Sequence, residues 1–392
     1  MISRVLENQI RNRLFSGKVI ILTGPRQVGK TTLIKQILND IPDLLFLDGD
    51  DPTIMKLLDR PNTEQLRQII GSNKVVFIDE GQRIHGIGLT AKIIVDQMPA
   101  VQLILSGSSS FALINQINEP LTGRKWTFSL WPVTWMEWQT HLGYVKAEQD
   151  IENRLVFGFY PDVLVNQPDQ QIILNELSES HLYKDVLMFS GIKKPDYIQK
   201  LVQALAWQVG NEVMYNEVAD ICGLDPKTVS SYIEILERAG VVFRLPSFSR
   251  NLRNEIKTSR KIYFYDNGIR NAVIGQFQPF QIRQDIGILW ENFLISERVK
   301  LLTYNKSSVN QYFWRTKQQQ EVDYVEVDGA KIYGFEFKWN PRQVKRLPTT
   351  FSNSYNSVNQ CITRNNFREF VCPSEIPHPP APSPHGEGED GA

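Results

Sequence analysis

A glycine-rich segment that joins an apolar run to an amphipathic one constrains the fold of this chain most strongly. Lys18–Thr23 is a strand-length apolar run that ends at Gly24, and helical periodicity begins at Thr31. The spacing between them fits the P-loop pattern, in which backbone amides and a helix N-terminus face phosphate groups. We therefore expect a strand, a tight turn and a helix in a parallel sheet, with a phosphate cradle made of Gly24, Pro25, Arg26, Gln27, Val28, Gly29, Lys30, Thr31 and Thr32.

A second apolar run, Val75–Ile78, ends in two acids. Lys30 is expected to reach the β- and γ-phosphates, and the Thr31 hydroxyl to ligate Mg²⁺. Asp79 is placed to hold the same ion, directly or through water, and Glu80 to polarise the attacking water. Together the two motifs predict a P-loop enzyme that binds ATP with Mg²⁺ and hydrolyses it.

Two further residues are candidates for the same site. The apolar run Val101–Leu105 leads into Ser106, whose hydroxyl could contact the γ-phosphate or the water; the alternative is an ordinary serine-rich turn. Arg124 is a candidate arginine finger that completes the site of a neighbouring subunit, which would make the protein a homo-oligomer. The alternative for Arg124 is a surface arginine with no role. Leu44–Leu47 is a fourth apolar run, besides Lys18–Thr23, Val75–Ile78 and Val101–Leu105. Together these runs favour an α/β fold whose parallel sheet is covered on both faces.

The overall composition excludes several classes of protein. Lys plus Arg equals Asp plus Glu at 43 each, which argues against a protein that coats nucleic acid without specificity but leaves a local basic patch possible. The three cysteines and five histidines are scattered, so neither a structural zinc site nor a disulfide framework is expected. No apolar stretch approaches the roughly 18 residues of a membrane span, and the start of the chain has no signal-peptide pattern. We expect a cytoplasmic protein with several domains and no membrane partner.

Short segments along most of the chain match one known pattern. Besides the P-loop and the Asp79–Glu80 pair, they are Phe46–Asp51, Ser106–Ser109, Leu121–Arg124, Phe157–Pro161, Tyr183–Val186, Lys261–Asp266 and Trp290–Asn292. In these segments the chain resembles the bacterial and archaeal AAA+ ATPases that carry a C-terminal domain of unknown function. The stretch Ile84–Gly88, which follows Gly81–Arg83, departs from that pattern, where the family often has proline and tryptophan.

The resemblance implies an α/β architecture with a P-loop AAA+ parallel sheet core, a helical lid, a winged helix and a C-terminal α/β restriction-endonuclease-like domain. We place the core at residues 1–150, the lid at 151–205, the winged helix at 206–255 and the nuclease-like domain at 256–373. The tail, 374–392, is rich in Pro, Gly and acidic residues and is expected to be disordered.

The region assigned to the winged helix carries a basic segment. Tyr215–Gly223 and Leu224–Arg238 have the pattern of a helix–turn–helix, but acids outnumber bases from 225 to 238, which is a poor composition for a phosphate-lined groove. The next stretch carries six bases against the single acid Glu255: Arg244, Arg250, Arg253, Lys257, Arg260 and Lys261. Two interpretations stay open, namely DNA contact by the segment Arg244 to Lys261 and a winged helix that docks protein or is purely structural.

A hairpin pattern near the C-terminus resembles the PD-(D/E)XK nuclease core. Strand alternation places Glu336 and Lys338 on one face, and Asp323 lies on the partner strand. Asp323 and Glu336 could share a metal, Lys338 could orient the water, and Glu291 could add a third carboxylate. The alternative is a solvated hairpin face with a cross-strand Glu–Lys pair.

Three functional classes follow from these patterns. The favoured one is an ATP-hydrolysing switch that acts on DNA through the C-terminal half. An ATP-regulated, metal-dependent nuclease would require Asp323, Glu336 and Lys338 to be active. A nucleotide-gated adaptor would bind protein through the winged helix and never contact DNA.

Overall fold

The computed structural model describes residues 1–107, 113, 116–117, 119–180, 195–249 and 260–372. The predicted disordered tail, the segment Tyr183–Val186 and three cations of the basic segment, Arg250, Arg253 and Lys257, lie outside the described residues.

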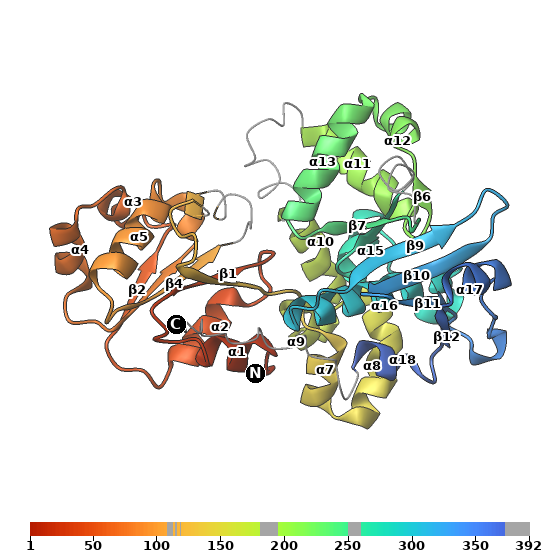
Figure 1. The fold of residues 1–392 in the computed structure, drawn as a ribbon, viewed down its shortest axis with the longest axis horizontal. Coiled ribbons are helices and arrows are strands. Elements are labelled where there is room, and N and C mark those ends of the chain that lie inside the picture. Colours follow the sequence, from red (N-terminus) through yellow and green to blue (C-terminus); the bar gives the residue numbers. More distant parts are fainter. Residues whose placement is uncertain (108–112, 114–115, 118, 181–194, 250–259, 373–392) are drawn as a thin grey trace, which may run out of the picture.

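The N-terminal third contains a parallel sheet, as the apolar runs predict. Its strands are β1 (Val19–Thr23), β2 (Leu44–Asp48), β3 (Val75–Asp79), β4 (Gln102–Gly107) and β5 (Lys125–Ser129). They are ordered β2-β3-β4-β1-β5, and every neighbouring pair is parallel. In Figure 1 this sheet and its helices form the left-hand part of the molecule. The carboxyl ends of β1, β3 and β4 meet at one edge, which brings the P-loop, Asp79 and Ser106 together.

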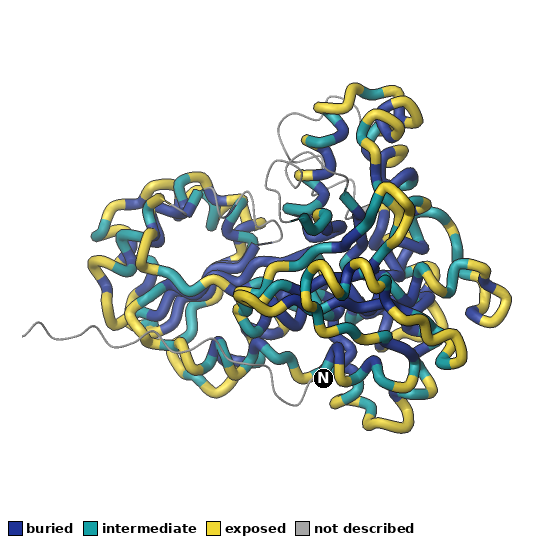
Figure 2. Tube along the Cα trace, turned by 45° about the vertical axis from the view of Figure 1, so that its right-hand side comes forward, coloured by how far each residue is buried: buried dark blue, intermediate teal, exposed yellow. Residues whose placement is uncertain are grey.

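Both faces of this sheet are covered by helices, because alternate strand residues point to opposite sides. On one face, Ile20, Phe77 and Ile104 pack with α1 (Leu6–Arg11) and α2 (Lys30–Leu38). On the other face, the intervening strand residues pack with α3 (Pro52–Leu58), α4 (Thr63–Ile70) and α5 (Ile87–Gln97). The central strands β1, β3 and β4 are buried along their whole length, whereas the edge strands β2 and β5 are only partly buried. Figure 2 shows this buried interior in dark blue.

The middle of the chain is helical and then forms a small sheet. The helices are α7 (Trp135–Leu142), α8 (Tyr144–Phe157), α9 (Pro161–Val165), α10 (Gln170–Ser180), α11 (Pro195–Trp207), α12 (Tyr215–Cys222), α13 (Pro226–Arg238) and α15 (Asn267–Val273). The strands β6 (Glu212–Val213), β7 (Val242–Pro246) and β8 (Arg260–Phe264) are antiparallel in the order β6-β8-β7. Since β8 lies beyond residue 255, the sheet that follows α12 and α13 continues past the boundary expected for the winged helix.

Helices α12 and α13 lie where the sequence predicts two helices joined by a short turn. Asp225 caps α13 by accepting hydrogen bonds from the amides of Lys227 and Thr228, both at 3.0 Å. Gly223 ends α12 in the left-handed conformation that favours glycine. These two signals explain why the helices begin and end where the sequence predicts.

The C-terminal part is built on a long helix and a mixed sheet. Helix α16 (Ile286–Tyr304) precedes β9 (Asn310–Arg315), β10 (Glu321–Asp328), β11 (Lys331–Phe337), α17 (Thr349–Tyr355), β12 (Val358–Ile362) and α18 (Phe367–Val371). The order is β12-β11-β10-β9, with β11 and β12 parallel and the other pairs antiparallel. Helix α16 contacts β5 of the N-terminal sheet as well as β8, β11 and α18, so it joins the two parts of the chain.

Candidate nucleotide site

The P-loop backbone depends on glycine at two positions. Gly24 has a φ of 151°, and a Cβ there would overlap the carbonyl oxygen of Leu130. Gly29 precedes α2 with a φ of 94°, in the region that L side chains rarely adopt. These conformations turn the chain from the end of β1 into the N-terminus of α2, as the motif predicts.

A chain of three side chains lies at the carboxyl edge of the sheet. The Thr31 hydroxyl donates to Oδ2 of Asp79 at 2.5 Å, and the Ser106 hydroxyl donates to Oδ1 of the same carboxylate. Asp79 and Ser106 are both buried. The three residues predicted from separate motifs are therefore in direct contact, although Ser106 is held on Asp79 instead of standing free toward a phosphate.

The Lys30 ammonium forms hydrogen bonds to backbone carbonyls of its own P-loop. Its Nζ donates to the carbonyl oxygens of Gly24 at 2.9 Å and Pro25 at 2.8 Å, and the residue is buried. Gly24 and Pro25 thus position Lys30, while the remaining predicted P-loop residues, 26–32, line a cavity.

Glu80 lies in an unusual backbone conformation beside this cavity. Its φ of 49° and ψ of 38° are left-handed, which a non-glycine residue adopts only where the surroundings impose it. Gln82 donates from Nε2 to Oε2 of Glu80 at 2.5 Å. Gln82 belongs to the 3₁₀ helix Gly81–Arg83, directly before the stretch that departs from the family pattern. Sequence analysis did not identify it, although a polar residue two positions after the acid was the available signal.

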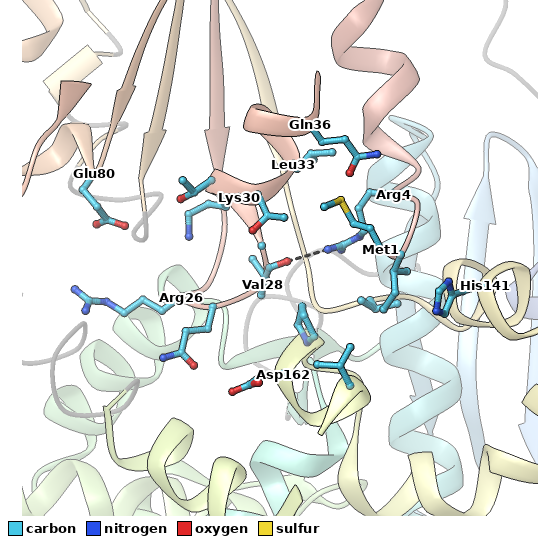
Figure 3. A pocket seen from close by; sticks show the side chains of 18 of the residues that line it. Met1, Arg4, Arg26, Val28, Lys30, Leu33, Gln36, Glu80, His141 and Asp162 are labelled. Atoms are coloured by element: carbon cyan, nitrogen blue, oxygen red, sulfur yellow. Dashed lines mark hydrogen bonds between the residues drawn. The ribbon is translucent and has the colours of Figure 1, made fainter. Parts of the chain in front are cut away.

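The cavity has a volume of about 660 Å³ and two chemically different ends. Figure 3 shows Arg26, Lys30 and Glu80 toward one end, and Met1 and His141 toward the other. The P-loop end is polar. Beyond the P-loop the lining combines apolar side chains, Met1, Ile2, Val133, Pro161 and Val165, with polar ones, Arg4, Gln36, His141 and Asp162. No local motif marks the N-terminal residues or the α9 residues as parts of the site, so sequence analysis missed them.

Arg4 connects the P-loop to distant parts of the chain. Its guanidinium donates to the carbonyl of Val28 at 2.8 Å, drawn in Figure 3, and to the carbonyl of Trp131 at 2.6 Å. It also pairs with Glu137 at 3.1 Å. Burial alone would lower the pKa of Arg4, but Glu137 and Tyr304 outweigh burial and raise it, so this buried cation is firmly charged. Because Tyr304 ends α16, Arg4 links the nucleotide cavity to the C-terminal part.

Arg124 lies at the opposite edge of the sheet from the P-loop. Its carbonyl accepts from the amide of Val19, at the start of β1, whereas the P-loop follows the end of that strand. A five-residue strand spans about 16 Å, so Arg124 is remote from the nucleotide cavity of its own chain. Its side chain is partly exposed and donates to Asp96 at 2.7 Å. A catalytic role for Arg124 would therefore require a second copy of the chain.

The residues predicted for a nuclease-type site also lie together. Lys338 Nζ is 2.8 Å from Oε1 of Glu336, and Asp323 accepts from the amide of Phe337 at 2.9 Å. Burial first, and then the negative charges of Glu291 and Glu336, raise the pKa of Asp323 to about 8. The predicted hairpin thus brings all four titratable residues close to one another.

A buried lysine enters this carboxylate cluster from β8. Lys261 is 1% exposed, lies 3.5 Å from Oε1 of Glu291 and pairs with Glu321. Burial would lower the pKa of Lys261, but Glu291, Asp323 and Glu321 raise it above its usual range. Within the described ranges, no three carboxylate, imidazole or thiolate side chains are arranged to hold a metal ion. The protein's own ammonium therefore neutralises the cluster.

The described cations of the basic segment are also used inside the protein. Arg244 pairs with Glu237, Lys261 lies in the carboxylate cluster, and the Arg260 guanidinium stands 5.3 Å from the centre of the Tyr215 ring. Arg244 and Lys261 are therefore already paired with acids, which a count of charges along the sequence does not show, whereas DNA contact by the segment as a whole stays a prediction.

Comparison with known proteins agrees with the N-terminal architecture. Residues 16–139 match the family model of an AAA domain, and residues 148–279 and 286–372 match two domains of unknown function, DUF8612 and DUF4143. The chain is 29% identical over 336 residues to an uncharacterised protein of Mycobacterium tuberculosis, covering 84% of this chain and 72% of that protein. It is 23% identical over 288 residues to an uncharacterised protein of Methanocaldococcus jannaschii, covering 67% and 64% of the two chains.

A solved structure has the same general fold. The Walker-type ATPase of Pyrococcus abyssi superposes with a TM-score of 0.50 at 15% identity, covering 70% of this chain and 96% of that one. Across the part of the chain that the structure describes, no helix combines the length and apolar character needed to cross a membrane. Residues 16–139 are thus similar to AAA domains in sequence, and the chain shares the general fold of a Walker-type ATPase.

Proposed function

We propose that the protein binds ATP with Mg²⁺ in the P-loop cavity and hydrolyses it. The contact of Thr31, Asp79 and Ser106 carries this proposal, because it joins the P-loop hydroxyl, the acid after β3 and the hydroxyl after β4 in one hydrogen-bonded chain. Glu80 lies next to this chain on the wall of the cavity. A loop that only binds phosphate would not need Asp79, Ser106 and Glu80 beside it.

Each residue has a defined task in this proposal. The phosphates take the place of the loop carbonyls as partners of Lys30, and the amides of the P-loop bind their oxygens. The Thr31 and Asp79 oxygens suit Mg²⁺, which prefers oxygen ligands. Bound Mg²⁺ supplies positive charge that stabilises the transferring phosphoryl group. Glu80, held by Gln82, orients the attacking water.

The part of the cavity beyond the P-loop suits the base of the nucleotide. Ile2, Val133 and Pro161 provide apolar surface, and Asp162 adds an acceptor for an amino group. A nucleotide that fills the cavity would therefore contact the N-terminal segment and α9 as well as the P-loop.

We further propose that the nucleotide state is transmitted to the C-terminal half, which acts on DNA, through Arg4 and α16. Arg4 contacts the P-loop carbonyl of Val28, and Tyr304 at the end of α16 accepts from the amide of Trp131 at 3.1 Å. ATP should therefore change amide hydrogen exchange in α16 in the wild type but not in Arg4→Lys. Amide hydrogen exchange in α16 that does not change with ATP in the wild type would refute this link.

We also propose that Arg124 of a second copy of the chain completes the nucleotide site.

Cleavage of nucleic acid at Asp323, Glu336 and Lys338 is not part of this proposal. Lys261 pairs with Glu291 and Glu321, and Lys338 pairs with Glu336, so the protein's own cations already balance these carboxylates. A nucleotide-gated adaptor that binds only protein remains the competing function, and the absence of any nucleic-acid binding would favour it.

The test compares ATP turnover of the wild type with that of Asp79→Asn. The amide cannot hold Mg²⁺ as the carboxylate does, so turnover should fall by about a hundredfold or more. Asp169→Asn is the matched control, since Asp169 is exposed and far from the motif residues in the sequence; its turnover should stay unchanged. Full turnover by Asp79→Asn would exclude hydrolysis at this site.

A further inference from the structure

Three cations surround one tryptophan at the edge of the N-terminal sheet. The Arg13 guanidinium lies 4.2 Å, the Lys18 ammonium 4.6 Å and the Lys306 ammonium 5.7 Å from the centre of the Trp126 ring. Trp126 is itself fixed, because its Nε1 donates to the Ser16 hydroxyl at 3.0 Å. We call Arg13, Phe15, Lys18, Trp126 and Lys306 the Trp126 cluster. Its members come from three separate parts of the chain and converge only in the fold.

The positive charge of the Trp126 cluster has no acidic counterpart. Among the residues that the structure describes, no carboxylate forms an ion pair with Arg13, Lys18 or Lys306. The pKa of Lys306 is lowered, first by burial and then by repulsion from Arg13. The cluster differs in this respect from Arg244 and Lys261, whose charges are neutralised by acids. The unbalanced charge favours an anionic ligand.

An exposed aromatic residue lies beside one of these cations, because Phe15 and Lys18 line the same small cavity. Phe15 is 54% exposed and has a φ of 56°, and Lys306 has a φ of 50°. A left-handed conformation costs a non-glycine residue about 1–3 kcal/mol, so the surrounding structure must hold it in place. The amide of Phe15 is held by Oε1 of Gln102 at 2.6 Å. The fold therefore maintains two strained residues, one aromatic and one cationic, on the same surface.

We propose that the Trp126 cluster binds single-stranded nucleic acid, with phosphates on Arg13, Lys18 and Lys306 and a base stacked on Phe15. Cations that follow the backbone and an aromatic ring that accepts a base are the two elements of sequence-tolerant single-strand binding. The cavity beside Phe15 and Lys18 measures only about 10 Å³, so the ligand lies across the surface instead of being enclosed. A membrane surface fits less well, because Phe15 is the one exposed large apolar side chain of the cluster.

The position of the cluster suits a partner of an ATP-driven switch. Trp126 lies on β5, and Lys306 follows the last residues of α16, so one bound strand would contact both parts of the chain. In this inference the DNA partner of the proposed function binds to the Trp126 cluster and not to the segment 244–261. The inference therefore rests in part on the proposed function. Binding of a strand here does not need ATP turnover, so the two proposals fail separately.

The test is fluorescence anisotropy of a labelled thymidine oligonucleotide of about 20 nucleotides with the full-length protein at low salt. The variant Arg13→Gln/Lys18→Gln/Lys306→Gln should bind at least tenfold more weakly, and its salt slope should fall by about two. Lys331→Gln/Lys345→Gln/Arg346→Gln is the matched control, since it removes two lysines and one arginine that are exposed and without ion pairs in the described structure. The control should bind like the wild type.

Phe15→Gly separates stacking from folding. Glycine removes the ring and accepts the positive φ without strain, so this variant should keep its thermal stability but bind at least fivefold more weakly. Equal loss in both triple variants, or no oligonucleotide binding by the wild type, overturns the proposal. So does cluster-dependent binding to phosphatidylserine vesicles or duplex DNA without binding to the single strand. Glu80→Gln should bind the oligonucleotide normally, which keeps a failure of ATP hydrolysis distinct from a failure of this surface.

Discussion

Replacement of Lys261 by methionine tests the structure of the C-terminal cluster most sharply. Lys261→Met keeps much of the side-chain volume but removes an ammonium that is 1% exposed. At an effective dielectric constant of about 20, a charge pair at the 3.5 Å separation of Lys261 and Glu291 has a gross attraction of about 5 kcal/mol. The net loss of stability is smaller than the summed attraction of Lys261 to its acidic partners, because burial of the ammonium also costs desolvation free energy in the wild type. Removal of one partner of a buried pair typically costs about 3–5 kcal/mol, which is the loss we expect.

The assay is urea unfolding at pH 8, followed by tryptophan fluorescence. Lys331→Met, at an exposed position on β11, should change the free energy of unfolding by less than about 0.5 kcal/mol. The double variant Lys261→Met/Glu291→Gln should recover part of the loss, since removing both partners leaves less uncompensated charge. A loss under about 1 kcal/mol for Lys261→Met, or no recovery in the double variant, would refute the neutralised cluster.

Three other predictions concern single positions. Gly24→Ala should abolish nucleotide binding, measured by titration with a fluorescent ATP analogue, because its Cβ would overlap the carbonyl of Leu130; unchanged affinity would contradict the loop geometry. Gln82→Leu should lower kcat about tenfold with little change in KM, since it frees the Glu80 carboxylate without touching the P-loop; a change confined to KM would oppose this role. Asp323 has a folded pKa of about 8 against about 3.9 in the unfolded chain, so the unfolded state loses its proton first and stability falls as pH rises from about 4 to about 8. Asp323→Asn should reduce that fall in urea unfolding, and an identical pH dependence would show that Asp323 is not the group responsible.

The elements encoded by local patterns could be predicted from the sequence. The P-loop and the Asp79–Glu80 pair are contiguous motifs whose glycines and acids have fixed positions in a strand–turn–helix unit. The apolar runs at β1 to β4 read as buried strands because both faces of the sheet are covered. The prediction does not include β5, Lys125–Ser129, because this edge strand lacks the continuous apolar run that marks the other four.

The contacts that join distant segments could not be predicted in this way. Arg4 bonds to Trp131, 127 positions away, and nothing near Arg4 in the sequence marks it. Lys261 reads as one base among six, yet the fold places it among carboxylates that neutralise it. The Trp126 cluster likewise depends on three segments that meet only in the folded chain. A count of charges along the sequence gives the charge composition of a segment. Which of those charged side chains form ion pairs depends on the tertiary structure.

The central claim is that Glu80 activates water for ATP hydrolysis at the P-loop. The most direct measurement is phosphate release at saturating ATP by the wild type, Glu80→Gln and the control Glu64→Gln, whose side chain is 69% exposed on α4. We predict that Glu80→Gln binds ATP as tightly as the wild type but releases phosphate about 10²–10⁴ times more slowly, while Glu64→Gln is unaffected. Phosphate release by Glu80→Gln at the wild-type rate would contradict the account.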